Sequence, residues 1–163
     1  MEEEARAAAE LRSKAGHPLL NEMWHEAWGR GCSCSFRVIS GSMRPLIEVG
    51  DLVKVTKVEP SRIGIGDVVA LQQGESVVVH RIIGKRWSNQ QLLFRHKGDA
   101  GDFSGIALAQ DLIGKACLIE KAGREMSLDT PGYAMSSKIL GWRLCLADGL
   151  RRAKHKLIRR RPG

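Results

Sequence analysis

The sequence lacks long stretches without charge: no run free of Asp, Glu, Lys and Arg exceeds eight residues. A membrane-spanning helix needs about 20 consecutive, mostly apolar residues, and a secretory signal peptide also has a continuous apolar core. We therefore expect neither a transmembrane helix nor a signal peptide in this chain. The predicted location is the cytoplasm, with peripheral attachment to a membrane left open.

Cysteine is present four times, but its spacing fits neither a disulfide framework nor a zinc site. Cys32 and Cys34 are separated by one residue instead of the two of a usual zinc knuckle, and Cys117 and Cys145 stand apart. Histidine, aspartate and glutamate form no grouping in the sequence that indicates a metal. We expect free thiols in a reducing compartment, and neither a metal nor another cofactor.

Aromatic residues are scarce, at 5% of the chain, whereas glycine occurs 18 times. This composition suits short strands that are joined by many turns. A hydrophobic content of 43% over 163 residues is enough for the core of one domain with additional terminal elements.

Net charge is concentrated at one end of the sequence. Residues 138–163 contain nine Lys and Arg against Asp148 alone, which accounts for the whole formal charge of +8 and leaves residues 1–137 neutral. Nucleic-acid binding by the whole domain is therefore not expected. The basic end has three interpretations: a packed helix with a solvated tail, a segment that attaches to an anionic membrane or acidic partner, and a nucleic-acid contact.

The pattern of residues predicts three zones. Residues 1–30 are rich in Ala, Glu and Leu and predict a helical segment. Residues 31–121 predict a β domain, because β-branched runs alternate with glycine-containing turns. Residues 122–163 predict a helix with a basic tail, and its apolar residues fall roughly on one face: Ile139, Trp142, Leu146, Leu150 and Leu157. The expected strands are 36–39, 52–58, 68–72, 76–83, 91–96 and 112–119. Val77–Val79 lacks strict alternation, so both faces of that strand should be covered.

Four short motifs carry the chemistry of the sequence. The first places two hydroxyls and a glycine after an apolar run and before a proline. The others contain a glycine–aspartate pair, a histidine at the end of a second apolar run, and a second glycine–aspartate pair. In order, they are Ser40-Gly41-Ser42-Met43-Arg44-Pro45 closed by Gly50-Asp51, then Gly66-Asp67-Val68-Val69, Val79-His80-Arg81-Ile82-Ile83 and Lys97-Gly98-Asp99-Ala100. Serine, histidine and aspartate are the groups that acyl transfer to a hydroxyl requires.

These motifs resemble the successive boxes of type I signal peptidases, over roughly residues 36–120. The match is to the Ser–His branch of the endoplasmic reticulum, archaea and some Gram-positive bacteria. The bacterial housekeeping branch and the related self-cleaving repressors have lysine where this chain has His80. The resemblance implies a mainly β, partly open barrel of the signal-peptidase and repressor-protease type, with helices at both ends. The absence of a membrane helix is a departure from that family.

The resemblance implies that Ser42 is the nucleophile, because it matches the second serine of the family motif. Gly41 would let the chain bend so that the Ser42 hydroxyl stands clear, and Pro45 would fix the direction in which the chain leaves. The resemblance gives Ser40 a second role, in which its hydroxyl helps the Ser42 backbone N–H to bind the oxyanion.

His80 is the candidate general base. A hydroxyl needs such a base within hydrogen-bond reach, and a histidine with an ordinary pKa near 6.5 is neutral at working pH. The remaining histidines match no motif and are interpreted as surface or structural residues: His17, His25, His96 and His155.

Two carboxylates are candidates for the group that orients His80. Asp99 matches the glycine–aspartate box of the family. The Ser–His branch usually carries a further aspartate six residues after that one, where this chain has Gly105, and Asp102 lies three residues earlier. Either aspartate could hold His80 in the required tautomer. Arg81 and Lys97 are interpreted as members of structural ion pairs.

The expected function is that of a serine endopeptidase that cleaves a precursor or leader peptide through an acyl-enzyme. The resemblance implies small side chains before the scissile bond, and a small cytoplasmic precursor is the hypothesised substrate. Two other functions remain open: a self-cleaving regulator, and an inactive module that binds peptides in the same groove.

Overall fold

A computed structural model describes residues 26, 33–74, 76–88 and 90–159. It contains eight strands, two short 3-10 helices and one long α-helix within these residues. The strands are β1 (Cys34–Arg37), β2 (Leu52–Thr56), β3 (Val68–Gln73), β4 (Ser76–Ser88), β5 (Gln91–Lys97), β6 (Ser104–Leu108), β7 (Leu112–Lys121) and β8 (Arg124–Ser127). The helical elements are η1 (Pro60–Arg62), η2 (Ala109–Asp111) and α3 (Pro131–Arg159). The predicted amino-terminal helix falls almost entirely outside the described residues.

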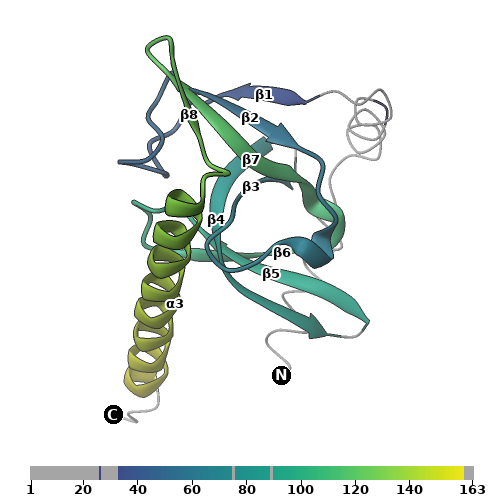
Figure 1. Ribbon diagram of the computed structural model, residues 1–163. Coiled ribbons are helices and arrows are strands. Elements are labelled where there is room, and N and C mark those ends of the chain that lie inside the picture. Colours follow the sequence, from purple (N-terminus) through teal and green to yellow (C-terminus); the bar gives the residue numbers. More distant parts are fainter. Residues whose placement is uncertain (1–25, 27–32, 75, 89, 160–163) are drawn as a thin grey trace.

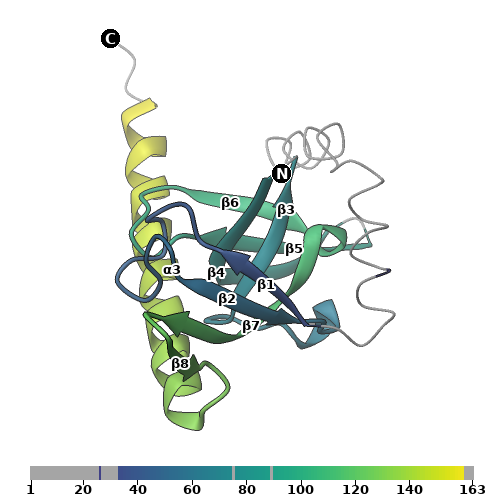
Figure 2. The same cartoon turned by 90° about the horizontal axis from the view of Figure 1, so that it is seen from above.

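All strands belong to one antiparallel sheet in the order β1-β2-β7-β3-β4-β5-β6, and β8 pairs with β7. The sheet curls into a half-barrel, and α3 lies against one side of it (Figure 1). The carboxy-terminal end of α3 projects beyond the strands (Figure 2). The expectation of a mainly β, partly open barrel followed by a helix is confirmed at this level.

The described structure contains the six strands predicted from the sequence, with shifted ends, and two further strands. β6 (Ser104–Leu108) has only five residues, and β8 (Arg124–Ser127) is exposed at all four positions. Neither strand has the long β-branched run or the alternation on which the prediction depended. Pairing with a neighbouring strand, and not local composition, makes these segments extended.

The core consists of two clusters on opposite faces of the strands. In β3, Val68 and Ala70 belong to one cluster, whereas Val69 and Leu71 belong to the other. Successive side chains of a strand point to opposite faces, so a continuous apolar run is buried on both. The same rule explains the run at Val77–Val79, whose residues pack partly against both clusters.

The long helix α3 (Pro131–Arg159) begins at a capped turn. The Thr130 hydroxyl accepts a hydrogen bond from the Tyr133 backbone N–H at 3.3 Å, and Pro131 occupies the first helical position. The helix contacts the turn before β3 through small residues: a Cβ added to Gly141 would lie 2.7 Å from the Gly66 nitrogen. This close approach leaves no room for a larger side chain at either glycine. Gly66 also has φ +97°, which favours glycine.

Candidate catalytic site

The loop that carries both candidate serines connects β1 to β2, and buried apolar side chains fix its position. Met43 and Ile47 are only 2% and 0% exposed and belong to the first core cluster. The Ile47 backbone N–H donates to the Met43 carbonyl at 3.0 Å, which closes a turn between them. Ser42 is therefore held next to an anchored residue and is half-buried, whereas Ser40 is exposed.

The end of this loop is closed by the predicted glycine–aspartate pair. The Asp51 carboxylate accepts a hydrogen bond from the Glu48 backbone N–H at 2.8 Å, and Gly50 has φ +97°. Asp67 makes the equivalent bond to the Gly64 N–H at 2.9 Å before β3. Both aspartates are turn residues.

Ser42 lies directly over Gly98, the residue that follows β5. The Ala100 N–H donates to the Ser42 carbonyl at 2.9 Å. A Cβ built on Gly98 would lie 2.5 Å from that carbonyl oxygen and 3.0 Å from the Ser42 Cβ. The two loops can approach this closely only because residue 98 has no side chain.

The register of β4 and β5 relates this contact to His80. Arg81 pairs with Lys97, which is the last residue of β5. His80 precedes Arg81 in β4, and Gly98 follows Lys97 in the chain. Ser42, which is seated on Gly98, therefore lies beside the end of β5 that pairs with the neighbour of His80.

The two serine hydroxyls lie beside each other, with Ser40 Oγ 3.4 Å from Ser42 Oγ. This distance is long for a bond between hydroxyls, so the contact is weak. Among the described residues, Ser42 Oγ makes no hydrogen bond to His80, and no backbone carbonyl accepts the Ser42 N–H. The hydroxyl can rotate at little cost, and the N–H can donate a hydrogen bond to an anion.

His80 makes its hydrogen bond to a second histidine, which the sequence interpretation had treated as surface or structural. The Nδ1 atoms of His80 and His96 are 2.9 Å apart, and their ring centroids are 5.1 Å apart. His96 is 1% exposed. Among the described residues, the other ring nitrogen of His80, Nε2, has no hydrogen-bond partner. That nitrogen can accept a proton when His80 carries its own proton on Nδ1.

A register shift explains why the two histidines meet. Gly84 pairs with Arg95 but Ile82 pairs with His96, so Ile83 is an extra residue in β4. Without this bulge His96 would be opposite Ile83 and would project from the face of Arg81. With it, His96 is opposite Ile82 and shares the face of His80, as its diagonal neighbour.

Burial determines the protonation state of the histidine pair. It lowers the pKa of His80 below its ordinary value of 6.5, and the nearby negative charge of Asp99 opposes this change. Burial, together with the charge of His80, lowers the pKa of His96 to about 4. Both rings are therefore neutral at pH 7, and one Nδ1 must donate to the other.

The structure places both candidate carboxylates against arginines instead of His80. Asp99 accepts bonds from Arg81 Nε at 2.7 Å and Arg81 Nη2 at 2.6 Å, in a buried pair. Asp102 is exposed and is paired with Arg151 of α3 at 2.9 Å. Neither aspartate makes a hydrogen bond to His80 within the described residues. The structure therefore places both aspartates on other partners, and Asp99 acts on His80 through its charge alone.

Arg81 is a structural residue, as the sequence indicated. Besides Asp99, it donates to the Gly66 carbonyl at 2.9 Å and to the Ser137 hydroxyl of α3. It is 1% exposed, so its charge depends on these partners. The Arg81 contacts connect β4, the loop after β5, the turn before β3 and the helix.

Comparisons with family models, curated proteins and solved structures find no match to this chain. Among the described residues, no group of three or more His, Cys, Asp and Glu could hold a metal ion. No helix in the described part of the chain is long and apolar enough to cross a membrane.

Proposed function

We propose that this protein is a serine endopeptidase, with Ser42 as nucleophile and His80 as general base. The observation that carries the proposal is the seating of Ser42 on Gly98, the residue that follows the Arg81–Lys97 pair next to His80. An ordinary serine turn would not require a glycine on a separate strand end to accommodate it. The free Nε2 of His80 and the unpaired N–H of Ser42 supply the two further functions that acyl transfer needs.

The proposed reaction begins with rotation of the Ser42 hydroxyl from Ser40 toward His80. Ser42 Oγ attacks the peptide carbonyl while its proton passes to His80 Nε2. The Ser42 N–H, with the Ser40 hydroxyl, stabilises the oxyanion; one such donor is worth about 2.7–4 kcal/mol of barrier. The His80 imidazolium then gives its proton to the leaving amine, which leaves an acyl-enzyme. Water, activated by His80, releases the acid and restores Ser42.

The proposed substrate is a precursor or leader peptide with small residues before the scissile bond. This part of the proposal depends on the sequence motifs, which resemble those of type I signal peptidases of the Ser–His branch. Cleavage of a small cytoplasmic precursor agrees with a chain in which the described residues include no membrane-spanning helix.

A serine-directed fluorophosphonate probe tests the chemistry without knowledge of the substrate. Mass spectrometry should locate the adduct on Ser42, and Ser42→Ala should abolish labelling. The rate should rise with pH, with a midpoint below 6.5, because only neutral His80 can accept the proton and its pKa is lowered by burial. Ser136→Ala is a matched control, because that exposed hydroxyl bonds the Gly132 carbonyl of its own helix at 2.7 Å.

Labelling that persists in Ser42→Ala at the rate of the intact chain would contradict the proposal. If incubation of the protein alone gives fragments at a rate independent of its concentration, the self-cleaving alternative is favoured. Peptide affinity without any labelling or cleavage would favour the inactive binding module.

We also propose that α3 attaches the protein to an anionic membrane surface. Five large apolar residues of this helix are each 57–74% exposed: Met135, Ile139, Trp142, Leu146 and Leu150. At 100° per residue they fall within an arc of about 80°. The opposite side of the helix, with Ser137 and Asp148, is buried. The apolar residues share a face, as predicted, but that face points away from the barrel.

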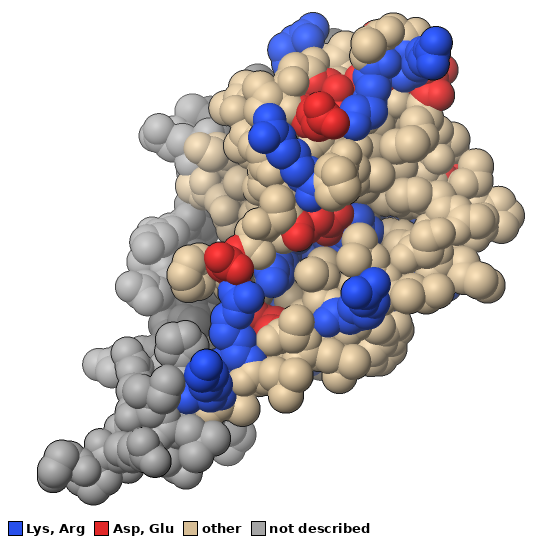
Figure 3. Space-filling model, turned by 90° about the vertical axis from the view of Figure 1, so that its left-hand side faces the viewer, with Lys and Arg blue, Asp and Glu red and all other residues tan. Residues whose placement is uncertain are grey.

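Charge on both sides of this apolar face supports a membrane as the partner. Lys138 borders it on one side, Arg143 and Lys154 on the other, and all three are exposed. Figure 3 views the α3 side of the molecule, where charged side chains form a band bordered by wide uncharged areas. A helix with an apolar face flanked by basic residues is typical of segments that lie in a membrane interface.

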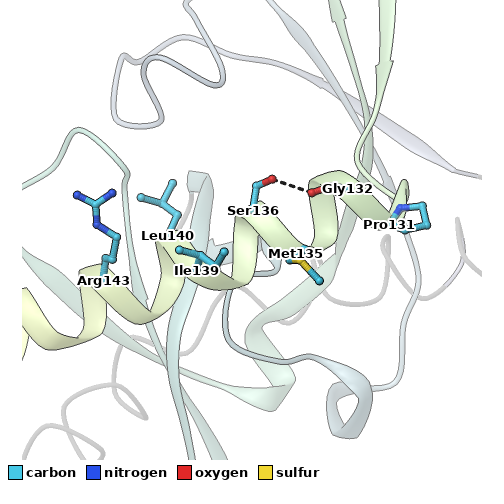
Figure 4. A pocket seen from close by; sticks show the side chains of 7 residues that line it. All are labelled: Pro131, Gly132, Met135, Ser136, Ile139, Leu140 and Arg143. Carbon is cyan, nitrogen blue, oxygen red and sulfur yellow. Dashed lines mark hydrogen bonds between the residues drawn. The ribbon is translucent and has the colours of Figure 1, made fainter.

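The same face contains a shallow hollow, whose lining residues all belong to α3 (Figure 4). They are Pro131, Gly132, Met135, Ser136, Ile139, Leu140 and Arg143. The Ser136 hydroxyl is turned back to the Gly132 carbonyl, so apolar groups and the Arg143 guanidinium remain to meet a partner. This combination suits an acyl chain below a phosphate headgroup.

A further inference from the structure

His96 is a buried histidine whose imidazole bonds only His80 and Gln73 within the described residues. It comes from β5 and shares the face of His80 because of the bulge at Ile83. A buried imidazole in a core usually bonds a backbone carbonyl or a carboxylate. Here its partner is the candidate base itself, at 2.9 Å.

We propose that His96 is the positioning residue of the catalytic group, in the place where such sites usually have a carboxylate. In the active tautomer His96 Nδ1 accepts a hydrogen bond from the Nδ1–H of His80, which leaves the lone pair of His80 Nε2 free for the Ser42 proton. This inference rests on the proposed function, because it assigns the third member of that site.

Both aspartates are already engaged and cannot take this role in the observed arrangement. The two carboxylate oxygens of Asp99 are bonded by Arg81 at 2.7 and 2.6 Å, and Asp102 is paired with Arg151 on the helix. Moving Asp99 to His80 would leave a buried guanidinium without its counter-charge, which is strongly unfavourable. His96 needs no movement to reach His80.

Gly105 is the residue that makes room for this histidine. It lies opposite His96 in the pairing of β5 and β6. A Cβ at position 105 would lie 2.6 Å from His96 Nε2 and 2.7 Å from Cε1, inside contact distance of the ring. A side chain at 105 and an imidazole at 96 are thus mutually exclusive. In a variant with aspartate at position 105 and alanine at position 96, the new carboxylate would occupy the space that the His96 imidazole now fills.

Gln73 sets the tautomer of the pair through the second nitrogen of His96. The amide nitrogen of Gln73 is 3.2 Å from His96 Nε2. With the amide nitrogen facing the ring, His96 Nε2 is the acceptor and its proton sits on Nδ1, so His80 would have its proton on Nε2. Rotation of the amide by 180° presents the oxygen, moves the His96 proton to Nε2 and frees His80 Nε2. The second arrangement is the active one.

The protons on the two histidines balance over the proposed catalytic cycle. His80 enters with one proton, on Nδ1, takes the Ser42 proton on Nε2, and gives it to the leaving amine. His96 keeps its single proton, on Nε2, throughout. The charged group that acts on His80 is Asp99, which follows β5 and is paired with Arg81. β3 presents apolar Val69 opposite His80. A neutral acceptor stabilises the His80 imidazolium less than a carboxylate does.

The experiment removes the imidazole at position 96 and introduces a carboxylate at position 105. His96→Ala should lower fluorophosphonate labelling of Ser42 by about 10- to 100-fold, because His80 loses its orientation. Gly105→Asp alone should also lower it, because the new side chain meets the His96 ring. The double variant His96→Ala/Gly105→Asp should recover at least about tenfold over His96→Ala. Its labelling midpoint should shift to higher pH than in the intact chain, because a carboxylate stabilises the imidazolium.

Histidine NMR separates this inference from the proposed function. In the double variant the titration midpoint of His80 should rise above that of the intact chain, whether or not Ser42 is reactive. If the intact chain is not labelled at all, the proposed function fails and the NMR shift still decides the histidine pair. A His96→Ala variant that is labelled at the unchanged rate with the unchanged midpoint overturns the inference. A double variant in which neither labelling nor the His80 midpoint moves also overturns it.

Discussion

Gly98 shows how one residue without a side chain can position a reactive group that is distant in sequence. Its Cα supports the main chain of Ser42, and the carbonyl of Ser42 is held by the Ala100 N–H at 2.9 Å. Met43 anchors the same loop from below. Contacts of the Ser42 backbone and of the adjacent Met43 thus fix the position of the Ser42 hydroxyl, without a strong hydrogen bond to the hydroxyl itself.

Substitution of Gly98 by alanine should displace Ser42. The new methyl group would lie 2.5 Å from a backbone oxygen that cannot rotate away, so the loop must shift, and labelling of Ser42 should fall by about tenfold or more. Gly101→Ala is the matched control, because its nearest contact would be 3.5 Å, which is ordinary van der Waals distance. Equal labelling rates in the two variants would show that the Gly98 contact does not position Ser42.

The helix α3 is an element with two different long faces. Its small and buried residues face the barrel, and Ser137 donates to the Gly66 carbonyl at 2.6 Å. Its large apolar residues face outward. The helix packs on the barrel through the close approach of Gly141 and Gly66, so its outward apolar residues are not needed for that packing.

Removal of apolar area from this outward face should weaken membrane binding without unfolding the protein. Leu146→Ser/Leu150→Ser should reduce co-sedimentation with vesicles of phosphatidylserine and phosphatidylcholine at low salt. Binding of the intact chain should also fall as salt rises or when the vesicles contain phosphatidylcholine alone. Trp87→Ser, at a 70% exposed residue of β4, should bind like the intact chain. Recovery of the intact chain in the supernatant under all conditions would rule out the attachment.

Element types were predictable from the sequence, whereas the pairing of elements was not. The β-branched runs and the spacing of apolar residues in α3 are local signals, and they indicated most elements. The contact between His80 and His96 depends on one bulged residue, Ile83, which changes the face from which His96 projects. Nothing in the local composition marks that bulge. Likewise, Asp102 carries no sign in the sequence that its partner would be Arg151, 49 positions away.

At the scale of the whole molecule, the buried histidines make stability depend on pH. The unfolded chain protonates His96 near pH 6.5, but the folded chain does so only at about pH 4. Between these values the unfolded state binds more protons, so acidification favours unfolding. The stability contributed by keeping His96 neutral is fully present above pH 6.5 and is lost as pH falls toward 4. A difference of this size corresponds to roughly 3 kcal/mol.

Urea unfolding at pH 7 and pH 4.5 should show this linkage. The free energy of unfolding should decrease on acidification, and the decrease should be smaller by about 2 kcal/mol in His96→Gln, which cannot titrate. The comparison between the two proteins removes the contribution of the carboxylates that they share. An identical decrease in both would mean that His96 titrates alike in the folded and unfolded chains.

Two neighbours in β4, His80 and Arg81, project from opposite sides of one sheet into unlike surroundings. One imidazole meets His96, and the adjoining guanidinium meets Asp99 and the helix. A shift of this strand by one residue would place the Arg81 guanidinium, a permanent cation, among Val69 and the apolar cluster around it. The same shift would place the His80 imidazole at the Asp99 carboxylate, which now binds two N–H donors of the guanidinium. Alignment of the strand is thereby enforced electrostatically, by the same dipeptide that holds the proposed base.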